Sequence, residues 1–95
     1  MYGISKNALD KIKTVLFSMQ GVEQVVLYGS RAKGNYKEGS DIDLTIKGKL
    51  TFDDLTKISV NLDDLNLPWT IDLSLYSQIS NKDLLDHIDR IGVAI

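Results

Sequence analysis

The chain has no cysteine, one proline and one histidine among its 95 residues. Without cysteine, disulfide bridges and thiolate zinc sites are excluded. With 7 glycines and 25% charged residues, collagen-like and low-complexity classes are excluded as well. No apolar run approaches the roughly 20 residues that span a bilayer, and the first residues do not resemble a signal peptide. We therefore expect a small soluble protein, located in the cytoplasm, without a membrane partner.

The charge balance excludes a second group of partners. Eleven basic and thirteen acidic side chains leave a formal net charge of −2. A chain with this balance lacks the excess of positive charge that drives binding to DNA, so no direct contact with nucleic acid is expected. Hydrophobic residues make up 43%, which is enough for one compact core. Residues 1–95 are therefore expected to form one domain.

Helix-like and strand-like patterns alternate along the chain. Helical spacing of apolar residues predicts a helix capped by Ser5 and ended by Gly21, a second opened by Thr51, and a third opened by Ser80 and ended by Gly92. Apolar residues expected to face inward from the second helix are Phe52, Leu55, Ile58, Leu62 and Leu65.

Strands are predicted over residues 23–28, 41–47 and 70–76, with a terminal stub at 93–95. Residues 30–40 lack apolar periodicity, which is typical of a loop with room for one short helical turn. The order is α-β-(loop/short α)-β-α-β-α. This order predicts an α/β (α+β) fold, in which helices pack against a mixed sheet of three to four strands.

Three aspartates share one face of the expected strands. Asp41 and Asp43 are two residues apart, so their Cα atoms lie about 6.5–7 Å apart and their side chains point the same way. Carboxylates this close repel one another unless a cation lies between them, and two divalent ions roughly 3.5–4 Å apart suit the pair. Asp72 adds a third carboxylate if the strands pair in register. Oxygen ligands without His or Cys favour Mg²⁺, with Mn²⁺ as the alternative, over Zn²⁺.

A short polar segment follows the first strand. Gly29 lets a ligand approach the backbone closely, and Ser30 adds a hydroxyl and an N–H group that favour phosphate. Arg31 and Lys33 bring positive charge, for which we favour phosphate binding over plain surface charge. Nucleotidyl transfer requires a phosphate cradle beside a two-metal carboxylate site. The metals bind the triphosphate and lower the pKa of the attacking hydroxyl, while the loop holds the leaving pyrophosphate.

The spacing of these two segments is that of a known signature. Gly-Ser at residues 29–30, then ten residues, then Asp-Ile-Asp at 41–43 resembles the signature of the nucleotidyltransferase superfamily related to DNA polymerase β. Residues 27–34 and 40–44 are most similar to the minimal nucleotidyltransferase (MNT) family. The similarity runs from about residue 23 to residue 72. It implies a small nucleotidyltransferase fold.

The resemblance implies a role for each residue that matches the motif. Gly29–Ser30 would bind nucleotide phosphates, Asp41 and Asp43 would ligate metal, and Asp72 would be the third carboxylate and the general base. Lys33 stands where many family members have arginine. A lysine there keeps the charge but loses bidentate geometry.

The resemblance also implies a reaction and a partner. MNT-family proteins are typically the antitoxins of HEPN-domain RNase toxins. The implied reaction is Mg²⁺-dependent transfer of AMP from ATP to a tyrosine hydroxyl near the toxin's active site, within a hetero-oligomer. Two alternatives stay open: neutralisation of the toxin by binding alone, and nucleotidylation of a small molecule such as an aminoglycoside.

Four residues outside the motif are assigned by position only. His87 is expected on the surface of the last helix, and Trp69 is expected to pack rather than to stack on a base. Tyr28 and Tyr36 flank the phosphate segment, and for both, packing and base contact stay open. The sequence does not determine the nucleobase, the acceptor or the stoichiometry of a complex.

Overall fold

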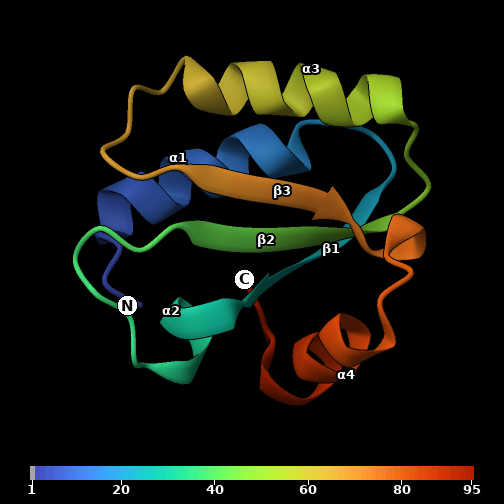
Figure 1. Ribbon diagram of the computed structural model, residues 1–95. Coiled ribbons are helices and arrows are strands. Elements are labelled where there is room, and N and C mark those ends of the chain that lie inside the picture. The colour runs from blue at the N-terminus through green and yellow to red at the C-terminus, as the bar shows by residue number, and fades with distance from the viewer. Residues whose placement is uncertain (1) are drawn as a thin grey trace.

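A computed structural model describes residues 2–95 as a sheet enclosed between two layers of helices (Figure 1). The elements, in chain order, are α1 (Lys6–Phe17), β1 (Val22–Tyr28), α2 (Gly29–Lys33), β2 (Ile42–Gly48), α3 (Phe52–Asp63), β3 (Ile71–Leu75), the 3-10 turn η1 (Tyr76–Gln78), α4 (Lys82–Ile91) and β4 (Val93–Ala94). The expected fold class and element order are confirmed, with α2 as the short helical turn. No helix within residues 2–95 has the length and apolar character needed to cross a membrane.

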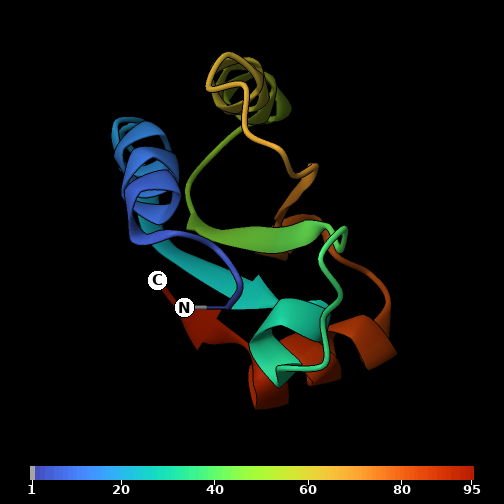
Figure 2. The same cartoon turned by 90° about the vertical axis from the view of Figure 1, so that its left-hand side faces the viewer.

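The sheet has the strand order β3-β2-β1-β4 and is mixed. Strand β2 lies inside it, antiparallel to β1 and parallel to β3, and β4 pairs antiparallel with the other edge of β1. Alternate residues of β2, namely Ile42, Leu44 and Ile46, are each only 1% exposed. They join one large apolar core with residues of α1 and α3, the two helices that cover the same face of the sheet (Figure 2).

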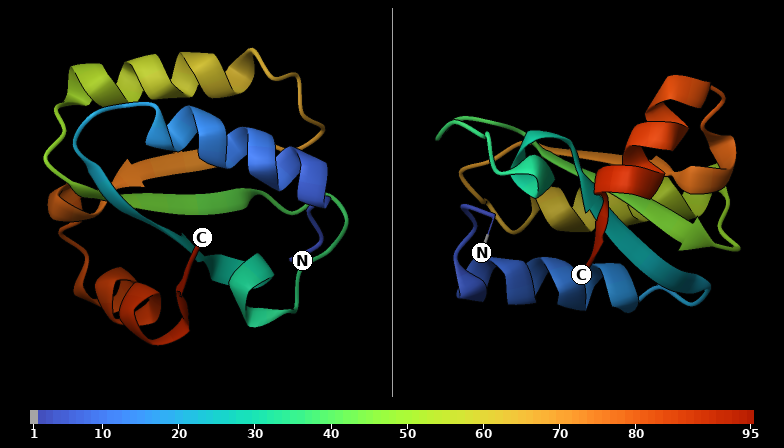
Figure 3. Two further views of the ribbon diagram at one scale, coloured as in Figure 1. Left: turned by 180° about the vertical axis from the view of Figure 1, so that it is seen from behind. Right: turned by 90° about the horizontal axis from the view of Figure 1, so that it is seen from below.

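The opposite face of the sheet carries α2 and α4, which lie side by side (Figure 3). A smaller apolar cluster fills the space beneath α4, and its buried members are Val26, Tyr28 and Ile88. This cluster covers only part of the face. The remainder presents the polar side chains of β2 and β3.

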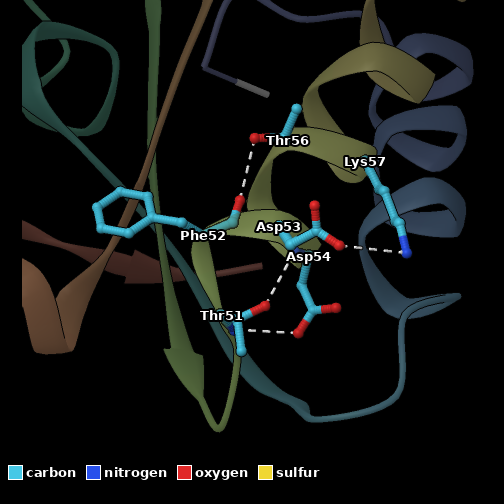
Figure 4. Close-up of polar contacts among 6 residues, drawn as sticks. All are labelled: Thr51, Phe52, Asp53, Asp54, Thr56 and Lys57. Carbon is cyan, nitrogen blue, oxygen red and sulfur yellow. Dashed lines mark hydrogen bonds and ion pairs between the residues drawn. The ribbon is translucent and has the colours of Figure 1, made fainter.

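The helices begin at residues whose side chains accept backbone hydrogen bonds. Ser5 accepts from the Ala8 N–H at 3.2 Å at the start of α1, as expected. At the start of α3, Thr51 accepts from the Asp54 N–H at 3.2 Å, and Asp54 accepts from the Thr51 N–H at 3.0 Å. This reciprocal capping box (Figure 4) satisfies two N–H groups that the helix itself leaves without partners.

The predicted cap of the last helix is wrong by one residue. The helix is capped by Asn81 and not by Ser80, and the Asn81 side chain accepts from the Leu84 N–H at 3.1 Å. Asn and Ser are about equally good caps. Cap preference alone therefore does not distinguish Ser80 from Asn81.

The prediction that Phe52 faces inward is also wrong, since its side chain is 66% exposed. At 100° per residue, Leu55, Ile58 and Leu62 fall on one stripe of α3, whereas Phe52 lies roughly 90° away from the middle of that stripe. The apolar side chain of Phe52, in the first turn of the helix, therefore lies outside the core.

The capping box predicts a measurable loss on substitution. Thr51→Ala should lower the free energy of unfolding by about 1 kcal/mol, because it removes the acceptor for the Asp54 N–H. Urea denaturation measures this difference. Thr51→Ser keeps the acceptor and should retain most of the stability. Thr56→Ala is a control, since the exposed Thr56 hydroxyl only donates back to the Phe52 carbonyl; equal losses in Thr51→Ala and Thr56→Ala would contradict the assignment.

Candidate active site

Three polar side chains form a row across the sheet. Tyr28 of β1 pairs with Asp43 of β2, which in turn pairs with Asp72 of β3. Residues paired in this way have side chains on the same face of a sheet. Asp41 precedes β2 by one residue and is exposed, as is Asp72, whereas Asp43 is half-buried. The strands thus pair in the register needed to bring the predicted carboxylates together.

The carboxylate of Asp43 lies in an unfavourable electrostatic environment. Partial burial, followed by the charges of Asp72 and Asp41, raises the pKa of Asp43 above its ordinary value, while nearby His87 opposes this shift. Mutual repulsion of this kind is relieved by a cation, and hard carboxylate oxygens are the ligands that Mg²⁺ and Mn²⁺ prefer. Within residues 2–95, however, no three acidic or histidine side chains already converge around one point as a metal site would require.

Gly29 brings the polar segment at residues 29–33 close to the carboxylate of Asp43. Its backbone φ of +75° suits glycine, and a Cβ at this position would collide with a carboxylate oxygen of Asp43. The turn can therefore approach Asp43 so closely only because residue 29 has no side chain. Ser30 follows in the first turn of α2 and is half-buried, so the predicted phosphate segment and the aspartates lie next to one another.

His87 belongs to this arrangement, and its predicted surface role is wrong. The Gly29 N–H donates to His87 Nε2 at 3.0 Å, so this ring nitrogen is the acceptor of the contact. The imidazole also contacts the Tyr28 ring edge to face, with centroids 6.1 Å apart. Because 58 residues separate His87 from Gly29, no local pattern in the sequence signals the contact.

Tyr28 is a packed residue of the row. Its side chain is 7% exposed, in the apolar cluster beneath α4. Burial is the main cause that raises the pKa of Tyr28; the charges of Asp72 and Asp43 add to it, and a hydrogen bond with the Ser74 side chain opposes it. The phenol is therefore neutral at physiological pH.

Arg31 has a different environment from the one predicted for it. It is 2% exposed, and all three guanidinium nitrogens donate to backbone carbonyls: Nε and Nη2 to Ser40 at 3.1 and 2.7 Å, Nη1 to Tyr2 at 3.0 Å, and Nη2 also to Glu38 at 3.4 Å. These bonds connect the N-terminal segment with the loop that leads to Asp41. The expected contact with phosphate is replaced by a structural role.

Two aromatic rings complete the surroundings of Arg31. Its guanidinium carbon lies 5.1 Å from the ring centroid of Tyr36 and 5.7 Å from that of Trp69, within the range of cation–π attraction. Trp69 also packs against the main core, as expected. The three residues line a cavity of about 670 Å³ to which none of the aspartates contributes. Lys33, by contrast, is exposed at the end of α2.

The environment of Arg31 predicts a loss of stability in Arg31→Ala. The free energy of unfolding should fall by roughly 3 kcal/mol, because three backbone carbonyls, those of Tyr2, Glu38 and Ser40, lose a charged donor. Lys33→Ala is the matched control and should change it by less than about 0.5 kcal/mol. Urea denaturation gives both values. Wild-type stability of Arg31→Ala together with weaker ATP binding would restore the phosphate role.

The raised pKa of Asp43 predicts a stability that depends on pH. Because its folded-state pKa is above the unfolded value, Asp43 favours folding below the unfolded pKa, and this contribution is lost as pH rises through the folded pKa. Asp43→Asn should therefore raise the thermal unfolding temperature at pH 7 in metal-free buffer, and raise it less at pH 3. Asp10→Asn, on the exposed side of α1, is the control. An equal effect of Asp43→Asn at both pH values would contradict the electrostatic account.

Comparison with known proteins places this geometry in a family. The family model "Polymerase beta, Nucleotidyltransferase" matches residues 10–95. The chain is also 31% identical over 94 residues to the Haemophilus influenzae protein named "Probable protein adenylyltransferase MntA", which covers 97% of this chain and 82% of that protein.

Two solved structures share the fold. A toxin–antitoxin crystal structure with AMP-PNP aligns with a TM-score of 0.71 and 17% identity, over 96% of this chain and 72% of the other. A mutant form of the toxin–antitoxin MntA–HpeT aligns with a TM-score of 0.68 and 14% identity, over 96% and 71%. Together with the aspartate row beside Gly29–Ser30, the family match shows that the chain is a nucleotidyltransferase of the polymerase β type and belongs to its minimal nucleotidyltransferase (MNT) family.

Proposed function

We propose that the protein is an antitoxin that transfers AMP from ATP, with Mg²⁺, to a tyrosine hydroxyl of a HEPN-type RNase toxin. The observation that carries this proposal is that Asp43 pairs with Asp72 across the sheet, with the charge of Asp41 near Asp43 and with Gly29 packed closely against the Asp43 carboxylate. A nucleotidyl transfer needs anionic ligands for a metal-bound triphosphate and backbone groups for its phosphates. Both lie where β1 ends and β2 begins, at the same end of these two neighbouring strands.

Each residue has a defined part in the proposed reaction. The acceptor hydroxyl oxygen forms a bond to the α-phosphorus of ATP, the bond from that phosphorus to the bridging oxygen breaks, and pyrophosphate leaves. Asp72 takes the hydroxyl proton, and Ser30 holds the phosphates. Asp41 and Asp43 would hold two Mg²⁺ ions, or Mn²⁺, with Asp72 as a further ligand. When bound, these ions neutralise charge on the triphosphate and lower the pKa of the attacking hydroxyl.

The exposure of the site supports a protein acceptor. Asp41 and Asp72 are exposed, so a protruding side chain of a partner can reach them. The curated relative is named a protein adenylyltransferase, and the structures that share the fold are toxin–antitoxin assemblies, one of them with AMP-PNP. These likenesses support AMP as the transferred group and a toxin as the partner, and a cytoplasmic location is consistent with that partner.

Mass and stoichiometry test the proposal. An enzyme should inactivate many toxin molecules per antitoxin, and each inactivated toxin should gain the mass of AMP. Asp41→Asn/Asp43→Asn should abolish transfer with the fold retained, because neither side chain belongs to the apolar clusters and both substitutions remove metal ligands. Intact mass spectrometry of toxin incubated with ATP and Mg²⁺ at a tenfold excess of toxin measures both quantities.

The matched control is Asp63→Asn/Asp64→Asn, which removes the same charge at the exposed end of α3 and should act as wild type. EDTA should stop transfer by the wild type. Inhibition only at one antitoxin per toxin, with unchanged toxin mass and equal protection by both double variants, would instead establish neutralisation by binding alone. Transfer to an aminoglycoside but not to the toxin would establish the small-molecule alternative.

A further inference from the structure

Helix α4 reaches the phosphate segment through one side chain. The Gly29 N–H donates to His87 Nε2 at 3.0 Å, in a partly buried position. The next residue, Ile88, is buried in the apolar cluster beneath α4. The helix that carries His87 is thus anchored to the sheet independently of the hydrogen bond, and the imidazole projects from a fixed support.

Gly29 begins α2 in a backbone conformation that favours glycine. It has no side chain, its φ is +75°, and its α-carbon lies so close to Asp43 that a Cβ would collide with the carboxylate. Glycine has more conformational freedom than any other residue, so a turn at this position needs an external restraint. The hydrogen bond to His87 is such a restraint, and it acts one residue before Ser30.

We propose that His87 is a positioning residue for nucleotidyl transfer, which holds the Gly29 amide and thereby fixes the turn that presents Ser30 beside Asp43. This inference rests on the proposed function. It also assigns the phosphate contacts within the segment: since the Gly29 N–H is already donated to His87, the Ser30 N–H and hydroxyl meet the phosphates. His87 acts through Gly29 and does not touch the nucleotide.

A competing possibility predicts the opposite change in nucleotide affinity when the imidazole is removed. If phosphate displaced His87 from the Gly29 N–H, removal of the imidazole would strengthen nucleotide binding. If His87 fixes the turn, removal weakens binding, because part of the binding free energy must then order the glycine. The direction of the change in AMP-PNP affinity therefore separates the two roles.

Substitutions at residue 87 test the acceptor itself. His87→Leu fills much of the space of the imidazole with an apolar side chain and removes the acceptor. His87→Gln places an amide oxygen near the position of Nε2, whereas the shorter His87→Asn cannot reach it. Leu84→Ala is the matched control, since it loosens the packing of α4 without changing the acceptor.

Two measurements on the full chain are needed. NMR measures the hydrogen-exchange rate of the Gly29 N–H, which is expressed relative to the rates of core amides of β2. Calorimetry with Mg²⁺ reports AMP-PNP affinity. In His87→Leu and His87→Asn we expect relative Gly29 exchange to rise about 2- to 12-fold, the value of one neutral hydrogen bond, and affinity to fall by a similar factor. His87→Gln should stay within about twofold of the wild type in both.

Four results would overturn the inference. The first two are unchanged Gly29 exchange in both His87→Leu and His87→Asn, and tighter AMP-PNP binding in His87→Leu. The other two are a loss of AMP-PNP affinity in His87→Gln equal to that in His87→Leu, and a relative Gly29 exchange in Leu84→Ala as fast as that in His87→Leu. A wild-type protein that binds no AMP-PNP would overturn the proposed function. The Gly29 exchange pattern would then still report whether His87 holds the turn, so the two failures are distinguishable.

Discussion

The packing of β2 against α1 and α3 is the constraint on which the rest of the structure depends. Ile42, Leu44 and Ile46 are almost completely buried in the main core, and each contributes roughly 1.5–3 kcal/mol on burial. Because side chains alternate along a strand, this burial places Asp43 on the opposite face. A slip of one residue would expose the three apolar side chains and bury the aspartate. The core thus sets the register, and the register sets the active site.

The same constraint holds acidic groups together against their repulsion. The in-register pairing of β2 with β3 puts Asp43 beside Asp72, and partial burial, followed by the charges of Asp72 and Asp41, raises the pKa of Asp43. The apolar face supplies the free energy that keeps the strands in this register. A site that is unfavourable by itself is maintained because it lies on the reverse side of a favourable core.

Side chains of α2 and α4, the two helices on the polar face, then determine which hydrogen-bond donors of residues 29–33 are already used within the chain. The guanidinium of Arg31 donates to the carbonyls of Tyr2 in the N-terminal segment and of Ser40 in the loop that precedes Asp41, and His87 accepts from the Gly29 N–H. In the first turn of α2, the Ser30 N–H and hydroxyl take part in neither of these two contacts. Of the two basic side chains in this segment, Arg31 is therefore engaged by backbone carbonyls of its own chain, whereas Lys33 is exposed.

The sequence by itself determined the element order, the two faces of β2 and the family signature, because strand alternation, helix caps and the spacing of residues 29–30 and 41–43 are local patterns. It did not determine which of Ser80 and Asn81 caps α4, since both are good caps. Only the tertiary structure decided the roles of Arg31 and His87. A guanidinium or an imidazole presents the same chemistry to a ligand as to the backbone of its own chain, and the choice depends on contacts 29 and 58 residues away in sequence, which exist only once the sheet has formed.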